Sequence, residues 1–176
     1  MIFTQGKAQG AKASIQGKAN EQALINYVEA SIYGQYIRTK TIGTKKNPKL
    51  VLDRNLPSEA TPHGGDFTQP DMLIDLPGKT IAIEQKSQES AGSCDVKTFF
   101  SIFQLSHLIK HNFCDQAYLL IRGYGWKKGW REFMLSGPIL LDFIPSQGYG
   151  EKYLQSGKLV VCTQEDFVRL LQTEKL

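Results

Sequence analysis

The sequence has 176 residues, of which 41% are hydrophobic and 22% are charged, proportions that are ordinary for a soluble globular protein. This length suits a single domain with a sizeable core. No apolar stretch approaches the ~20 residues of a membrane span, and the amino terminus lacks the apolar segment of a signal peptide, which argues against a membrane protein. Three cysteines without a CxxC pair predict reduced thiols in a cytoplasmic protein.

The net charge of +4 is unevenly distributed along the chain. Residues 1–50 contain eight basic and two acidic side chains, which gives +6 and leaves −2 for the remainder. A basic first third suits a polyanionic partner, because each phosphate that a cation neutralises releases counterions. A solvated lysine-rich surface accounts for the same charge, so both interpretations stay open at this point.

The first part of the chain alternates polar segments with short apolar patterns. Residues 1–19, rich in Gly, Lys, Ala and Gln, predict a flexible or weakly helical basic arm. Asn20 is a good N-cap, and the apolar spacing after it predicts a helix over roughly 20–36. A basic segment, a short strand and a loop are then expected in this order, at 38–49, 50–52 and 53–70.

A β-hairpin is predicted around the Pro77-Gly78 dipeptide. Proline pre-sets φ at one turn position, and glycine accepts the positive φ that the next position requires. If these two residues form the loop, counting back along both strands places Asp71 directly opposite Glu84. Side chains alternate along a strand, so Lys86 and Gln88 share the face of these two acids. Like charges opposed so closely are destabilising, which indicates a cation between them rather than a purely structural ion-pair cluster.

The second part of the chain predicts a strand–helix–strand unit and a closing helix. Ser93 is the expected N-cap of a strongly apolar helix, and the apolar run at 117–121 is typical of a buried strand. A helix between two such strands predicts a parallel, right-handed crossover. Two further strands are expected at 132–135 and 159–162. A closing helix is expected after Thr163, which is its N-cap.

These elements predict one domain over residues 20–176 with an α/β (mixed α+β) fold, in which a central mixed β-sheet is flanked by helices. Pro70-Asp71, twelve residues and then Glu84-Gln85-Lys86 resemble the PD-(D/E)xK nuclease superfamily of restriction-endonuclease type. The order helix, strand, strand with the motif, helix, strand is also similar to the core of that fold, over roughly 20–122. The resemblance implies a restriction-endonuclease-like core.

The resemblance also implies a role for each matching residue. Asp71 and Glu84 would hold Mg²⁺, which Mn²⁺ can replace, with the main-chain carbonyl of Gln85 as a further ligand. Lys86 would orient or help deprotonate the attacking water and stabilise charge at phosphorus. Gln88 would position water or phosphate. Members of the family generally leave 5′-phosphate and 3′-hydroxyl ends.

Glu21 is a third candidate acid for the metal. It shares a helix face with Leu24, Ile25 and Val28, where an acid is unfavourable unless it meets a cation or water. Members of the superfamily often place a glutamate on this helix near the metal. A negative charge in the first turn is also favourable to the helix dipole, so a purely structural interpretation of Glu21 stays open.

Two groups of residues are candidates for DNA contact. Lys45 and Lys46 belong to the basic first third of the chain. The segment 122–131 interleaves aromatic and basic residues with glycine, and such loops can enter a groove or stack on bases. The residues of this segment expected to contact DNA are Trp126, Lys127, Lys128 and Arg131. A surface loop whose tryptophans cover the core is the alternative.

The sequence therefore predicts a Mg²⁺-dependent DNA endonuclease of the type II restriction kind that cuts double-stranded DNA. Because one site cuts one strand, cleavage of both strands predicts a homodimer. Three alternatives stay open. They are a structure-selective nuclease such as a junction resolvase or repair enzyme, a non-catalytic nucleic-acid-binding module, and a protein-interaction domain.

Overall fold

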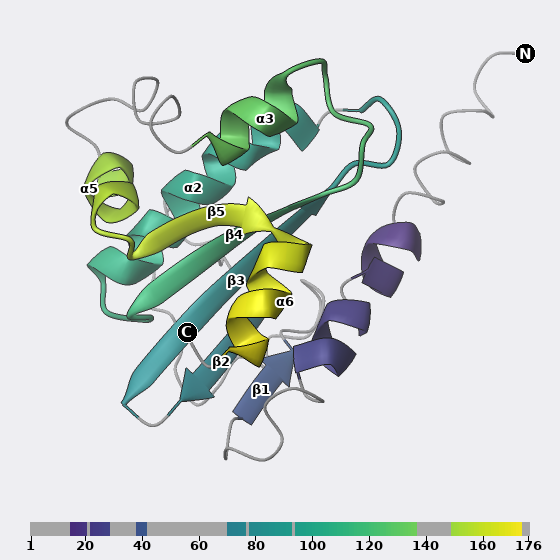
Figure 1. Ribbon diagram of the computed structural model, residues 1–176. Helices are drawn as coiled ribbons and strands as arrows, with labels where there is room; N and C mark the ends of the chain where they lie inside the picture. Colours follow the sequence, from purple (N-terminus) through teal and green to yellow (C-terminus); the bar gives the residue numbers. More distant parts are fainter. Residues whose placement is uncertain are drawn as a thin grey trace, which may run out of the picture.

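The computed structural model of the protein describes residues 15–20, 22–28, 38–41, 70–76, 78–92, 94–136 and 149–173. These residues form a five-stranded mixed sheet with helices on both of its faces (Figure 1). The α/β fold with a central mixed sheet flanked by helices, as predicted from the sequence, is thereby confirmed.

The sheet has the strand order β1-β2-β3-β4-β5, which follows the chain. Its strands are β1 (Arg38–Thr41), β2 (Met72–Leu76), β3 (Lys79–Ser87), β4 (Gln116–Arg122) and β5 (Leu159–Thr163). The first three strands pair antiparallel, whereas β3, β4 and β5 pair parallel. Strand β3 therefore joins an antiparallel half of the sheet to a parallel half.

The labelled helices connect and cover the strands. They are α2 (Cys94–Lys110), α3 (Trp130–Leu135), α5 (Tyr149–Gln155) and α6 (Gln164–Gln172). Helix α2 makes the crossover between the parallel strands β3 and β4, as the strand–helix–strand pattern predicted. Among the described residues, no helix combines the length and the apolar character needed to cross a membrane.

Two apolar clusters lie on opposite faces of the sheet. One packs α2, α3 and α5 against the face of β3 that carries Ala82. The other packs α6 and the helical residues 22–28 against the face that carries Ile81 and Ile83 (Figure 1). Because side chains alternate along a strand, Glu84, two residues after Ala82, lies on the same face as α2.

The hairpin has the register predicted from its sequence. Its pairs run from Leu76 opposite Lys79 to Met72 opposite Ile83. Gly78 has φ 79°, the left-handed conformation that its turn position requires. Pro77 lies outside the described residues. This turn fixes the register of β2 against β3, and the register in turn places Asp71 across from Glu84.

The closing elements also agree with their prediction. Strand β5 ends at Thr163, whose side chain accepts a hydrogen bond from the main-chain N–H of Asp166 and so caps α6. Phe167 and Leu171 point into the core from the inner face of this helix.

Three predictions about local structure are wrong. Residues 15–20 are helical, so the helix begins before Asn20, whose side chain contacts Gln16 and Ser87 instead of capping it. Part of the basic segment, Arg38–Thr41, is strand β1 and pairs with β2. The strand expected at 132–135 is helix α3, in which Met134 is fully buried. The strand expected at 50–52 lies outside the described residues.

Phe167 provides a test of the packing of α6. Its fully buried ring lies 5.0 Å from the ring of Tyr118, measured between centroids. Phe167→Ala should lower the free energy of unfolding by about 3–5 kcal/mol in urea denaturation, because it removes buried apolar area and leaves a cavity. Phe103→Ala is the matched control, since Phe103 is 53% exposed, and should change it by about 0.5 kcal/mol or less. Equal effects of the two substitutions would contradict this packing.

Candidate active site

Asp71 and Glu84 are held against each other by bonds to the backbone of the opposite strand. The main-chain N–H of Asp71 donates to Oε2 of Glu84 over 3.2 Å. The N–H of Gln85 donates to Oδ2 of Asp71 over 2.7 Å. Each carboxylate is thus anchored beyond the end of the β2–β3 ladder, and the two acids lie side by side as the register predicted.

Lys86 completes this cluster from the same face of β3. Its Nζ donates a hydrogen bond to Oε1 of Glu84, and its side chain is 20% exposed. Burial acts to lower the pKa of Lys86, but the negative charges of Glu84 and Asp71 outweigh it, and the net shift is upward. Lys86 is therefore a cation at neutral pH.

The pKa values of the two acids are also raised, which for a carboxylate favours the neutral form. Burial, together with the charge of Asp71, raises the pKa of Glu84 to about 7, although Lys86 acts to lower it. Burial also raises the pKa of Asp71, against the hydrogen bond from Gln85 and the charge of Lys86. One lysine thus compensates two buried carboxylates incompletely, and the cluster can accept a further positive charge.

Strand geometry predicts that the carbonyl of Gln85 points to the side of Asp71. In an extended strand the N–H and C=O of one residue point to the same side, and the N–H of Gln85 points to Asp71. Counting the register on beyond Met72 and Ile83 would place Pro70 opposite Gln85, and proline has no N–H to offer that carbonyl. Two carboxylates and a carbonyl are hard oxygen donors of the kind that Mg²⁺ prefers.

This donor set is sparse. Within the residues that the structure describes, no group of three or more His, Cys, Asp and Glu side chains is arranged to hold a metal ion. Mg²⁺ commonly uses one or two carboxylates and completes its shell with water and substrate phosphate. The residues present therefore fit Mg²⁺, and they do not provide the closed four-ligand shell of a structural zinc site.

Gln88 lies on the predicted face but makes different contacts from those expected. Its side chain is only 5% exposed, and both N–H groups of its amide are engaged, one with Oδ1 of Asp95 and one with the carbonyl of Gly125. Its Oε1 accepts the main-chain N–H of Cys94. The amide therefore has no donor left for the water or phosphate contact that the sequence predicted.

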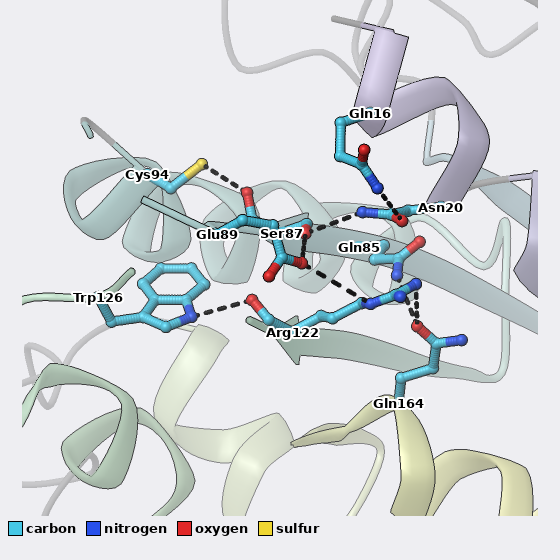
Figure 2. Close-up of polar contacts among 9 residues, drawn as sticks. All are labelled: Gln16, Asn20, Gln85, Ser87, Glu89, Cys94, Arg122, Trp126 and Gln164. Carbon is cyan, nitrogen blue, oxygen red and sulfur yellow. Dashed lines mark hydrogen bonds and ion pairs between the residues drawn. The ribbon is translucent and has the colours of Figure 1, made fainter. Parts of the chain in front are cut away.

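The segment after β4 places its aromatic residues differently from the prediction. Trp126 is 8% exposed, belongs to the core and donates its indole N–H to the carbonyl of Arg122 (Figure 2). The covered ring favours the alternative in which the tryptophan packs on the core, and the contact of Trp126 with DNA stays a prediction. The exposed aromatic residue of this segment is Tyr124, whose ring lies 5.4 Å from the guanidinium carbon of Arg131.

The basic residues of the segment differ in their exposure, and one of them lies near the first turn of α2. Lys127 is 75% exposed, and its Nζ lies 3.8 Å from Oδ2 of the buried Asp95. Lys128 is exposed and Arg131 is half-buried. Their predicted contact with DNA stays a prediction. Glu21, Lys45 and Lys46 lie outside the described residues, so their roles also stay predictions.

The opposite face of β3 carries a polar network (Figure 2). The side-chain amide of Gln85 and Nη1 of Arg122 both donate to Oε1 of Gln164, at 2.9 and 3.3 Å. Ser87 accepts a hydrogen bond from Asn20 and donates one to Glu89. This network connects the amino-terminal helical residues, β3, β4 and α6 at the carboxyl ends of the strands.

Sequence reasoning missed two features beside the site. Asp95 was not singled out, although it is buried and contacts both Gln88 and Lys127; an acid in the first turn of a helix is explained locally by the helix dipole. The close approach of Gly123 and Gly125 to the chain at Gln88 and Ser90 was also missed. The glycine spacing was the available signal, but it does not name the partner segment.

Comparison with protein families finds one match within the chain. Residues 64–144 match the family model of a PD-(D/E)XK nuclease superfamily domain, and this range contains β2, β3, α2, β4 and α3. This match agrees with the resemblance in the sequence, and it suggests nuclease activity. No curated protein and no solved structure matches the chain.

The raised pKa of Glu84 generates a prediction about the metal-free protein. The folded value of about 7 exceeds the ordinary value of 4.5, so the folded state binds a proton that the unfolded state releases over this range. Stability from this group is present below about pH 4.5 and is lost as the pH rises through about 7. Glu84→Gln, which is neutral throughout, should flatten the fall in melting temperature between about pH 5 and pH 8.

Asp71 contributes in the same direction as Glu84, so a smaller pH dependence should persist in Glu84→Gln. The control is Glu165→Gln, at an exposed position on α6, which should reproduce the wild-type curve. The melting temperatures are measured in thermal melts with a chelator present. If melting temperature depended on pH in the same way in wild type and Glu84→Gln, the burial of this charge would be contradicted.

Proposed function

We propose that this protein is a Mg²⁺-dependent endonuclease that hydrolyses phosphodiester bonds in DNA, with Mn²⁺ able to replace Mg²⁺. The observation that carries the proposal is the pair Asp71 and Glu84, opposed across the hairpin with Lys86 beside them. The family match over residues 64–144 supports the same activity. Asp71 and Glu84 would hold the metal, with the Gln85 carbonyl as a further ligand.

A divalent cation held there by Asp71 and Glu84 would lower the pKa of a bound water and offset charge on the phosphate. Lys86, protonated at neutral pH, orients the attacking water and stabilises the negative charge that develops at phosphorus. A bond forms from the water oxygen to phosphorus while the bond to the 3′ oxygen breaks. The water loses a proton to solvent and the 3′ oxygen takes one up, which leaves 5′-phosphate and 3′-hydroxyl ends.

The finer proposal is a type II restriction-like enzyme that cuts both strands of a duplex. Two sites are needed to cut two strands in one encounter, so we propose a homodimer as the active form. Lys127, Lys128 and Arg131 are the proposed DNA contacts among the described residues, because they are basic and follow one another closely in the chain after β4, and Lys127 lies close to the first turn of α2. The three free cysteines suit the reducing cytoplasm, where we place the enzyme.

Substitution of the site residues tests the activity. Lys86→Ala and Asp71→Asn should each lower the rate of Mg²⁺-dependent cleavage of plasmid DNA by about 10²–10⁴-fold, because the first removes charge stabilisation and the second removes a metal ligand. DNA binding should largely survive. Lys79→Ala is the matched control, because Lys79 lies at the other end of β3, and should cleave like wild type.

Two results would contradict the assignment. Cleavage that is unchanged in both Lys86→Ala and Asp71→Asn would show that another site acts. Salt-sensitive DNA binding by the wild type without any cleavage in Mg²⁺ or Mn²⁺ would favour the non-catalytic nucleic-acid-binding module instead.

The choice of substrate is tested by comparing a linear duplex with a four-way junction of the same sequence. The restriction-like proposal predicts that the duplex is cut at least as fast as the junction and that the cuts fall at a fixed sequence when the ends are sequenced. The sedimentation of the protein on DNA should correspond to two chains. Strong preference for the junction, with cuts at the branch point, would identify a structure-selective nuclease.

A further inference from the structure

Gln88 joins three segments next to the candidate active site. It follows β3 directly and lies two residues after Lys86. Its amide bonds to the main chain of Cys94 at the start of α2 over 2.8 Å and to the carbonyl of Gly125 over 2.8 Å. A third, longer bond of 3.2 Å reaches Oδ1 of Asp95. One buried amide therefore connects the catalytic strand, α2 and the segment after β4.

The backbones of these segments are also in direct contact. The N–H of Gly125 donates to the carbonyl of Gln88 over 2.7 Å, and the N–H of Gln88 donates to the carbonyl of Arg122 over 3.1 Å. A side chain at Gly125 would collide with the backbone of Ser90, and one at Gly123, whose φ is +85°, would collide with that of Gln88. The two glycines therefore allow the segment 123–125 to lie directly against the end of β3. The main-chain bonds and the Gln88 amide hold it there.

The fixed segment leads directly to two adjacent lysines. Lys127 is the second residue after Gly125, and its Nζ lies 3.8 Å from Oδ2 of Asp95. That oxygen is buried and has no hydrogen-bond partner, whereas the side chain of Lys127 is 75% exposed, so the cation of this ion pair is in contact with solvent. Lys127 can turn towards a phosphate while its backbone stays in place.

We propose that Gln88 is a positioning residue that acts on the substrate through Lys127 and Lys128. By holding the segment 123–126 against β3, it sets the distance between these two lysines and Lys86. The lysines then bind phosphates of the strand that is cut, next to the phosphate that is hydrolysed. This inference rests on the proposed nuclease function and replaces the direct contact of Gln88 with water or phosphate.

A double-mutant cycle separates an indirect role of Gln88 from a direct one. Affinity for a fluorescent DNA duplex is measured with a chelator present, as a function of salt. In the wild-type background, Gln88→Met should weaken binding about tenfold, because the same side-chain volume no longer holds Gly125 and Cys94. In the background of Lys127→Ala with Lys128→Ala, the same substitution should change binding less than twofold.

The two lysines give a second measurement that does not depend on Gln88. Lys127→Ala with Lys128→Ala removes two phosphate contacts, so the negative slope of log affinity against log salt should become less steep by roughly 1.8. Gln88→Met alone should also make that slope less steep, which a merely destabilising substitution far from the lysines would not do. Gln116→Leu is the matched control, because its amide bonds to the carbonyl of Gly157 at the opposite end of β4 and should leave slope and affinity unchanged.

Each outcome decides the inference. An equal loss of affinity in both backgrounds would show that Gln88 contacts the substrate directly, and unchanged affinity in the lysine variants would show that the segment does not bind DNA. If Gln88→Met does not fold, Gln88→Asn makes the same comparison, since its shorter, uncharged amide does not reach Cys94 and Gly125 together. Absence of metal-dependent cleavage by the wild type would contradict the proposed function itself, which is a separate result.

Discussion

The opposition of Asp71 and Glu84 across an antiparallel hairpin is the constraint on which the site depends. Two carboxylates so close repel each other, and burial adds to the unfavourable free energy of their ionised forms. The bonds from each strand's N–H groups to the acid of the other strand, together with the contact from Lys86, hold them in place. Such an arrangement requires a register that cannot slip, because a shift by one residue would turn one acid to the other face.

Strand β3 provides that register because it is paired on both sides and covered on both faces. It is antiparallel to β2 and parallel to β4, and its residues 81–84 are all buried. Because side chains alternate along β3, the residues of the motif lie on its two opposite faces. Glu84 and Lys86 face the site, whereas the side chain of Gln85 enters the polar network with Arg122 and Gln164. The three consecutive residues therefore anchor the strand end and form the site at the same time.

The parts of this site that could be predicted from the sequence are those specified by local rules. The Pro77-Gly78 turn and the two-residue period of a strand were sufficient to place Asp71 against Glu84 and Lys86 on the same face. The environment of Gln88 was not predicted, because it is determined by a segment more than thirty residues away, and the sequence could not decide between DNA contact and core packing for Trp126, because burial depends on the assembled core. Helix α3 was missed for a related reason, since a run of six residues carries too little periodicity to separate helix from strand.

The net charge of the cluster depends on the protonation of Glu84 and on a bound cation. With both acids ionised and Lys86 protonated, the three side chains sum to −1. Near neutral pH the metal-free protein reduces this charge by holding a proton on Glu84, whose pKa is about 7. A divalent cation in place of that proton would bring the sum to +1, which matches the single negative charge of a phosphodiester. The same repulsion that makes the empty pair unfavourable therefore favours the cation and, with it, the anionic substrate.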